Sequence, residues 1–168
     1  LWEVGDNRES VQNARKDLIK IGKPAYEFII FNKLNSKDSL RFRALESIIP
    51  ERPELAGPML RTVLVDENAE IESRKNAIYF LGKIQDIELK DYILNLFSEK
   101  EYQSAVVNYA KHLKIREIEP LIIKALPPLS EPKAISYLDV LGEIGGGESV
   151  DFLINYLKSD KNIILRTA

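Results

Sequence analysis

The side chains that most often perform chemistry are scarce in this chain of 168 residues, which contains no cysteine and one histidine, His112. Thiol nucleophiles, disulfides and cysteine-based metal sites are therefore excluded, and acid–base catalysis has one imidazole at most. His112 follows Lys111 and has no second histidine or His-Glu pair to complete a ligand set. We expect an ordinary surface or inter-helix histidine, and we predict no catalytic residue, metal or cofactor.

Two further features could bind or protonate a ligand. The run Gly145-Gly146-Gly147-Glu148-Ser149 precedes an expected helix, where backbone N–H groups can hold an anion. No lysine accompanies this run and Glu148 would repel a phosphate, so we expect a turn with a Ser or Glu cap. Carboxylate pairs such as Asp66 with Glu67 occur in polar turns, which favours solvated charge over catalysis.

The charge balance limits the partners. Lysine and arginine number 24 against 26 aspartates and glutamates, and the sequence pI is about 5.6. Proteins that hold nucleic acid through its phosphates carry a basic excess, so no nucleic-acid partner is expected. No apolar stretch approaches the roughly 18 residues of a membrane span, so we expect no membrane insertion. The chain begins with Leu1 and not Met, which leaves localisation open, with the cytoplasm slightly favoured and export possible.

An internal repeat must position whatever functional residues remain. Apolar residues at spacing 0, 3, 4 and 7 form one stripe of an amphipathic helix, and such quartets occur here in pairs. The first quartets of the pairs start at Ala14, Ala44, Ala77, Val106 and Tyr137, in steps of 30, 33, 29 and 31 residues. All but four of the forty stripe positions are apolar, the exceptions being Asp17, Lys33, Ser47 and Glu51. A period of this length predicts stacked helix pairs.

Glycine, proline or short polar segments separate the predicted helices, and no strand-like alternation of useful length occurs. We therefore predict an all-α fold and one repeat domain over residues 1–168. Its units cover approximately residues 6–35, 36–67, 68–99, 100–129 and 130–160, and a truncated sixth unit starts at 161. This pattern suggests a segment of a longer protein.

The repeat resembles a known family. The phrases Ala77-Ile-Tyr-Phe-Leu-Gly-Lys-Ile84 and Leu138-Asp-Val-Leu-Gly-Glu-Ile-Gly145, the latter followed by Val150-Asp-Phe-Leu-Ile-Asn-Tyr-Leu157, are similar to the short HEAT repeats of bilin-lyase-like HEAT proteins. The resemblance implies a right-handed α-solenoid whose concave wall is lined by the second helix of each pair. It identifies the fold and says little about activity, because such repeats are mostly scaffolds for protein contacts.

We expect the concave surface to include positions one and five of each second-helix stripe, together with the neighbouring row. The candidate protein-binding residues are Glu27, Phe31, Arg61, Lys90, Asp91, Leu94, Glu119, Ile123, Lys124, Asp151, Asn155 and Tyr156. The neighbouring row also contains Phe28, Asn32, Pro58, Thr62, Asn95, Pro120 and Phe152. Both signs of charge interleave with aromatic and aliphatic side chains, which suits a protein or peptide ligand. The alternative is that these residues form ordinary solvated faces.

The sequence thus predicts a non-enzymatic scaffold that binds a protein or peptide on its concave face. One alternative is a HEAT-type accessory or lyase-like subunit that acts with a partner chain. Another is a structural spacer within a larger protein. Base excision, which some HEAT proteins perform, requires a basic groove, and the acidic pI argues against it.

Overall fold

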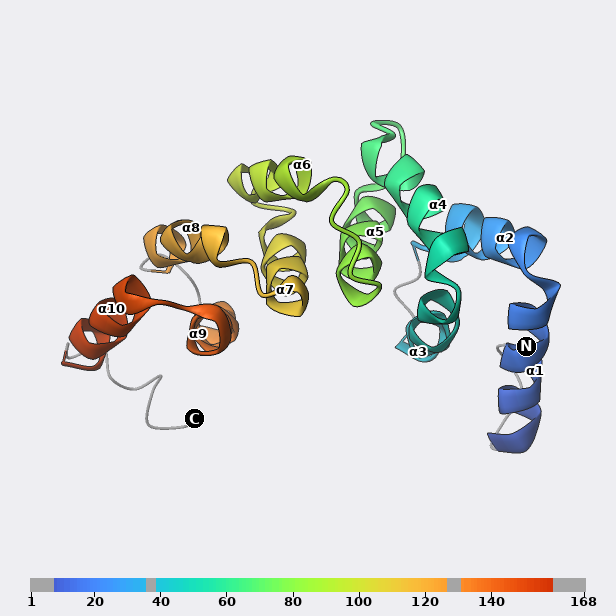
Figure 1. Cartoon of the computed structure of the whole chain (residues 1–168), viewed down its shortest axis with the longest axis horizontal. Coiled ribbons are helices and arrows are strands. Elements are labelled where there is room, and N and C mark those ends of the chain that lie inside the picture. The colour runs from blue at the N-terminus through green and yellow to red at the C-terminus, as the bar shows by residue number, and fades with distance from the viewer. Residues whose placement is uncertain (1–7, 36–38, 127–130, 159–168) are drawn as a thin grey trace. The chain divides into compact units, whose positions relative to one another are not determined.

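The computed structural model describes residues 8–35, 39–126 and 131–158, which form ten α-helices and no strand (Figure 1). The all-α fold class is confirmed for these residues. The helices are α1 (Arg8–Ile21), α2 (Lys23–Lys33), α3 (Ser39–Ile48), α4 (Pro53–Val65), α5 (Ile71–Lys83), α6 (Lys90–Asn95), α7 (Gln103–Leu113), α8 (Glu119–Ala125), α9 (Glu131–Ile144) and α10 (Gly147–Lys158). Three 3-10 turns, η1 (Ile49–Glu51), η2 (Leu96–Ser98) and η3 (Arg116–Ile118), lie between helices. Each consecutive pair of α-helices falls inside one of the five predicted units.

The contacts group the chain into two compact units, the N-terminal unit (Leu1–Lys90) and the C-terminal unit (Asp91–Ala168). The predicted single repeat domain would include both. No helix in the described part of the chain is both long enough and apolar enough to cross a membrane.

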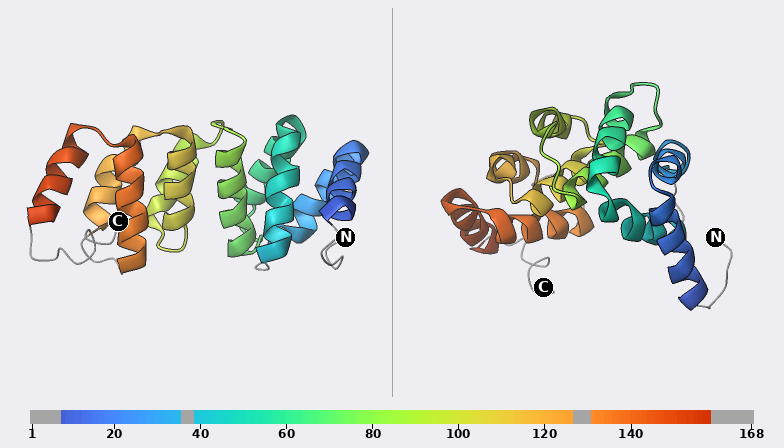
Figure 2. Two further views of the ribbon diagram at one scale, coloured as in Figure 1. Left: turned by 90° about the horizontal axis from the view of Figure 1, so that it is seen from below. Right: turned by 45° about the vertical axis from the view of Figure 1, so that its right-hand side comes forward.

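In the N-terminal unit, corresponding helices of successive pairs pack together. Helix α1 contacts α3, α2 contacts α4, and α4 also packs against α5 (Figures 1 and 2). The core between them is apolar, with Leu45, Leu60 and Leu81 fully buried. Phe42 of α3 lies with its ring centroid 5.4 Å from those of Tyr79 and Phe80 of α5, so an aromatic cluster joins these two helices. Burial of such side chains is the main stabilising contribution to the packing.

Polar side chains connect the same helices by bonding to backbone carbonyls. The Tyr26 hydroxyl donates to the Ile48 carbonyl at 2.5 Å, and burial raises the pKa of Tyr26 to about 12. Asn76 Nδ2 donates to the carbonyl of Leu34, the C-cap of α2, at 2.7 Å. Arg74 Nε donates to the carbonyl of Leu64 near the end of α4 at 2.9 Å. Side chains of α5 therefore satisfy carbonyls that the ends of α2 and α4 leave without helical partners.

The C-terminal unit has the same pairing of corresponding helices. Helix α7 contacts α9, and α8 contacts α10. Tyr109, Tyr137 and Leu141 are buried between these helices. At the surface, Lys111 Nζ of α7 lies 2.6 Å from Asp139 Oδ2 and 2.8 Å from Glu143 Oε1 of α9. The pairing rule therefore holds within each unit separately.

Most predicted stripe residues are buried, and the stripes of α4 and α9 are buried at all four positions. Some stripe positions are exposed, so the prediction that they pack in the core is wrong there. Ile21 is 58% exposed, Val150 54% and Ile154 43%. These residues belong to the first and last described pairs, where described neighbours cover the stripe from one side only. Tyr92 and Leu121, at 37% and 39%, lie at the border of the buried stripe. The expected sixth unit lies outside the described residues.

Candidate functional site

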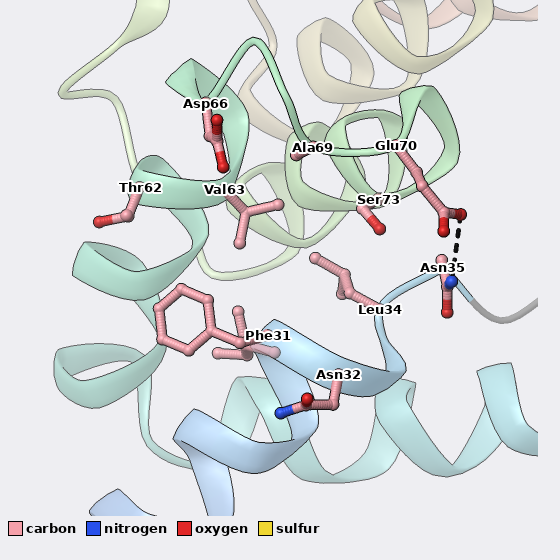
Figure 3. Close-up of a pocket in the computed structure, with 11 residues that line it drawn as sticks. Phe31, Asn32, Leu34, Asn35, Thr62, Val63, Asp66, Ala69, Glu70 and Ser73 are labelled. Carbon is pink, nitrogen blue, oxygen red and sulfur yellow. Dashed lines mark hydrogen bonds between the residues drawn. The ribbon is translucent and has the colours of Figure 1, made fainter.

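Two adjoining hollows lie between α2 and α4 in the N-terminal unit. The amino-terminal hollow, about 410 Å³, is lined by Lys23, Glu27, Phe31, Glu54, Leu55, Pro58, Met59 and Thr62. The carboxyl-terminal hollow, about 230 Å³, is lined by Ile30, Phe31, Asn32, Leu34, Asn35, Thr62, Val63, Asp66, Ala69, Glu70 and Ser73 (Figure 3). Phe31 and Thr62 line both hollows, so we treat the two together as one surface, the α2/α4 groove.

Helix periodicity explains why α2 presents Glu27 and Phe31 to this groove. The buried face of α2 carries Ala25, Tyr26, Ile29 and Ile30. Glu27 and Phe31 are four residues apart, so they lie one above the other on a different face. Phe31 keeps 51% of its surface exposed, which leaves a large apolar side chain available for contact.

On α4 the groove is lined by Pro58 and Thr62, again four residues apart. Pro58 has no N–H and cannot donate to the carbonyl of Glu54, one turn earlier in the helix. Thr62 Oγ1 donates to the Pro58 carbonyl at 3.0 Å. Of the two rows predicted for the concave surface, the neighbouring row (Pro58 and Thr62) lines the α4 side of the groove beside Glu54, Leu55, Met59 and Val63, whereas Gly57 and Arg61, at positions one and five, do not line it.

The charged side chains that line the groove are mostly acidic. Glu27, Glu54, Asp66 and Glu70 face one lysine, Lys23. Lys23 Nζ lies 3.7 Å from Glu27 Oε1 in an exposed pair. Arg52, which does not line the groove, donates from Nε to Glu54 Oε1 at 2.5 Å, and this hydrogen bond lowers the pKa of the Glu54 carboxyl. The groove therefore carries net negative charge at neutral pH.

Arg61, a predicted binding residue, forms ion pairs with other residues of the chain. Its guanidinium pairs with Asp86, and its second terminal nitrogen lies 2.9 Å from Glu88 Oε2. The turn after α5 can approach because the α4 position beneath it is Gly57, where a Cβ would lie 2.8 Å from Asp86 Oδ2. This turn thus covers Gly57 and Arg61, which are positions one and five of the α4 stripe. Arg61 does not line the α2/α4 groove.

Glu119, another predicted binding residue, is 8% exposed and caps a helix. Its carboxylate accepts hydrogen bonds from the backbone N–H of Gly146 at 3.0 Å and of Ser149 at 2.7 Å, at the start of α10. The Ser149 hydroxyl, together with these amides, lowers the pKa of the Glu119 carboxyl. The glycine run does present amides to an anion, and that anion is the chain's own carboxylate. The prediction of a Ser or Glu cap from within the run is therefore wrong, because the capping carboxylate comes from α8 and Glu148 is exposed.

The other predicted binding residues lie on or beside their expected helices, and the structure does not gather them into the α2/α4 groove. Ile123 and Leu94 are half-buried, Lys90 is half-buried at the start of α6, and Asp91, Lys124, Asp151 and Asn155 are exposed. The side chain of Tyr156 lies outside the described residues. Of the twelve predicted residues, the structure brings Glu27 and Phe31 together in one site.

Sequence reasoning missed Asp66 and Glu70 as site residues. Both residues follow α4 in the turn before α5. The sequence pattern favours solvated charge for Asp66 and gives no sign of a role for Glu70. Their place in the groove depends on how that turn folds back toward Asn35, whose Nδ2 donates to Glu70 Oε2 at 3.1 Å (Figure 3). No local pattern in the sequence signals this contact across 35 positions.

The groove offers contacts for binding. Its side chains are apolar, amide, hydroxyl and carboxylate groups, with one paired lysine. Within the described ranges, no cluster of three or more His, Cys, Asp or Glu side chains could hold a metal ion. His112 lies half-buried on α7 in the C-terminal unit.

Comparisons with known protein families, with curated proteins and with solved structures found no match to this chain.

Proposed function

We propose that this chain is a non-enzymatic interaction module, built as an α-solenoid of HEAT-like repeats, that binds a protein or peptide along its second helices. The observation that carries the proposal is the α2/α4 groove, in which Phe31 is half exposed between two hollows. Both helices are the second members of their pairs, as the repeat pattern requires of a ligand-binding wall.

The pairing of corresponding helices supports the repeat part of the proposal. Within the N-terminal unit α1 contacts α3 and α2 contacts α4, and within the C-terminal unit α7 contacts α9 and α8 contacts α10. A repeat array has this pattern because each pair buries its apolar stripe against the next. The five sequence units recur at steps of 29 to 33 residues, which is the regular spacing expected of such an array.

The lining of the groove supports a peptide as the ligand. Phe31, Leu55, Pro58 and Met59 supply apolar surface, while carboxylates and amides lie around them. Protein-binding sites combine an apolar centre containing aromatic anchors with a polar rim. Complete burial of an exposed phenylalanine contributes about 1.5–3 kcal/mol, so burying the exposed half of Phe31 contributes about half of that.

A peptide library displayed on phage and selected against the whole chain tests the proposal. We expect selected peptides to bind saturably and to lose at least about tenfold in affinity, roughly 1.4 kcal/mol, when Phe31→Ala removes the anchor. Phe28→Ala is the matched control, because Phe28 is 56% exposed on the same helix but lines neither hollow.

Circular dichroism of both variants should match the unmodified chain, since both side chains are exposed. Selected peptides that bind Phe31→Ala and the unmodified chain equally would contradict binding at this groove. Failure to select any saturable peptide would favour the spacer alternative.

A further inference from the structure

The carboxyl-terminal hollow has the composition of a binding site for a cationic side chain. Its lining includes the carboxylates of Asp66 and Glu70 and contains neither lysine nor arginine. In Figure 3, Phe31, Leu34 and Val63 turn toward the hollow, and the two carboxylates lie around it. An apolar floor beneath carboxylates suits a side chain with a long aliphatic stem and a charged end.

The hydrogen bonds already made in this hollow leave acceptors available. Asn35 Nδ2 donates to Glu70 Oε2, and the Asn68 backbone N–H donates to Asp66 Oδ1. Asn32 Nδ2 donates to the Phe28 carbonyl at 3.1 Å. The second carboxylate oxygen of each acid, Glu70 Oε1 and Asp66 Oδ2, can still accept a hydrogen bond. So can the amide oxygens of Asn32 and Asn35. Ammonium and guanidinium groups carry three to five donors and no acceptor.

Two basic side chains of the N-terminal unit, Arg61 and Lys33, contact groups that do not line this hollow. Arg61 pairs with Asp86 and Glu88. Lys33 Nζ lies 5.4 Å from the ring centroid of Phe28. The two carboxylates share the hollow with Phe31, whose ring also attracts cations.

We propose that the α2/α4 groove binds a basic peptide segment, with a lysine or arginine side chain in the carboxyl-terminal hollow and a neighbouring apolar side chain against Phe31 in the amino-terminal hollow. This inference rests on the proposed function and names its ligand class. The apolar lining from Leu55, Pro58 and Met59 requires an apolar group beside the cation. A peptide supplies both groups on one backbone.

The test measures the affinities of three short synthetic peptides for the whole chain by fluorescence anisotropy. The first alternates lysine and leucine, the second replaces each lysine by glutamate, and the third replaces each leucine by serine. We expect the first to bind at least about tenfold tighter than either of the others. Its affinity should also fall as salt is raised, because the carboxylates are near the surface and are screened.

Two variants and two matched controls locate the binding. The double change Asp66→Asn and Glu70→Gln keeps hydrogen-bonding groups at both sites but removes the charge, and should weaken the lysine–leucine peptide by about tenfold. Phe31→Ala should weaken it by a similar factor. Asp17→Asn, an exposed carboxylate on α1, and Phe28→Ala should leave the affinity unchanged.

The outcomes separate this inference from the proposed function. If the glutamate peptide binds as tightly as the lysine peptide, or if the double variant binds the lysine peptide unchanged, the basic ligand is wrong. A peptide of any charge that still depends on Phe31 would keep the groove as a binding site. If Phe31→Ala weakens none of the three peptides and none selected from a library, both proposals fail.

Discussion

Glu119 shows how one side chain can connect two helix pairs. It stands at the start of α8, and its carboxylate accepts hydrogen bonds from backbone amides at the start of α10. The first amides of a helix have no partner within the helix, and they carry the positive end of its dipole. A carboxylate in this position satisfies the amides and complements the dipole. The contact therefore ties the second helix of pair five to that of pair four.

Replacing this cap should lower stability. Glu119→Gln removes the negative charge and weakens the bonds to Gly146 and Ser149, and we expect a loss of about 1–2 kcal/mol in the free energy of unfolding at pH 7. Glu148→Gln, an exposed change in the first turn of α10, should cost less than about 0.5 kcal/mol. Urea unfolding followed by circular dichroism measures both; equal losses would remove the capping role.

The same contact makes a prediction about pH. The pKa of the Glu119 carboxyl is lowered in the folded chain from its ordinary value of 4.5, chiefly by the Ser149 hydroxyl and then by the backbone amides. Below pH 4.5 the unfolded chain binds this proton first, so the stabilisation is complete above that pH and is lost as pH falls through the folded pKa. The difference in stability between the unmodified chain and Glu119→Gln should shrink on acidification, and a constant difference would contradict it.

At the scale of single residues, the sequence predicted which helix carries a side chain better than it predicted what that side chain contacts. It placed Arg61 and Glu119 on the second helices but assigned both to a ligand. The structure pairs Arg61 with Asp86, 25 positions away, and Glu119 with Gly146, 27 positions away. Stripe periodicity indicates which face a residue occupies. It does not reveal the turn that folds back over that face.

Helix ends show a second kind of regularity, at the scale of the element. Helices α5 and α7 both end with a left-handed residue, Gln85 at φ 57° and Lys114 at φ 54°. After α7 the Lys114 N–H donates to the Lys111 carbonyl and the Ile115 N–H to the Ala110 carbonyl. This is the Schellman arrangement, which usually has glycine at the left-handed position. Two of the five helix pairs therefore share one turn geometry without glycine.

Glycine at this position should be stabilising. A side chain at positive φ costs about 1–2 kcal/mol, and glycine avoids that cost but loses more conformational entropy on folding. We expect Lys114→Gly to raise the free energy of unfolding by about 0.5–1 kcal/mol, as read from urea denaturation. Lys114→Ala is the control and should bring no gain, because alanine keeps the Cβ. A destabilised glycine variant would show that the lysine side chain itself holds the turn.

The elements themselves were largely predictable. The 0, 3, 4, 7 spacing found both helices of each pair, and Ala77, Phe80 and Leu81 are fully buried as expected. The same rule failed at Ile21 and Val150, which lie in the outermost described pairs and are exposed. The spacing defines an apolar stripe but contains no information on whether a neighbour covers it.

Leu81 tests the predicted stripe at its centre. It is fully buried on α5, so Leu81→Ala should cost about 2–5 kcal/mol through lost burial and the cavity left behind. Ile87→Ala, at a residue that is 65% exposed in the turn after α5, should cost less than about 0.5 kcal/mol. Denaturant unfolding of both variants gives the comparison. Similar small losses would mean that the stripe is wrongly placed.

At the scale of the whole molecule, the proposal joins a regular pattern of helix pairs to one irregular feature. Corresponding helices pair within each unit, and this regularity follows from the repeat. The α2/α4 groove arises where Phe31 of one pair faces Pro58 and Thr62 of the next. Repeat modules acquire specific ligands through such local side-chain differences on a common scaffold. Composition and periodicity predicted the helices and their pairs, while the acidic lining near Asp66 and Glu70 depended on the folded turn.

Binding at the second helices is the central claim, and amide chemical shifts test it most directly. A peptide selected from a library should be titrated into the isotopically labelled whole chain, with backbone amide signals followed by two-dimensional nuclear magnetic resonance. The account predicts that the perturbed amides concentrate in residues 23–35 and 53–73, which supply the lining of both hollows. Perturbations concentrated outside these segments, or none at saturating peptide, would contradict it.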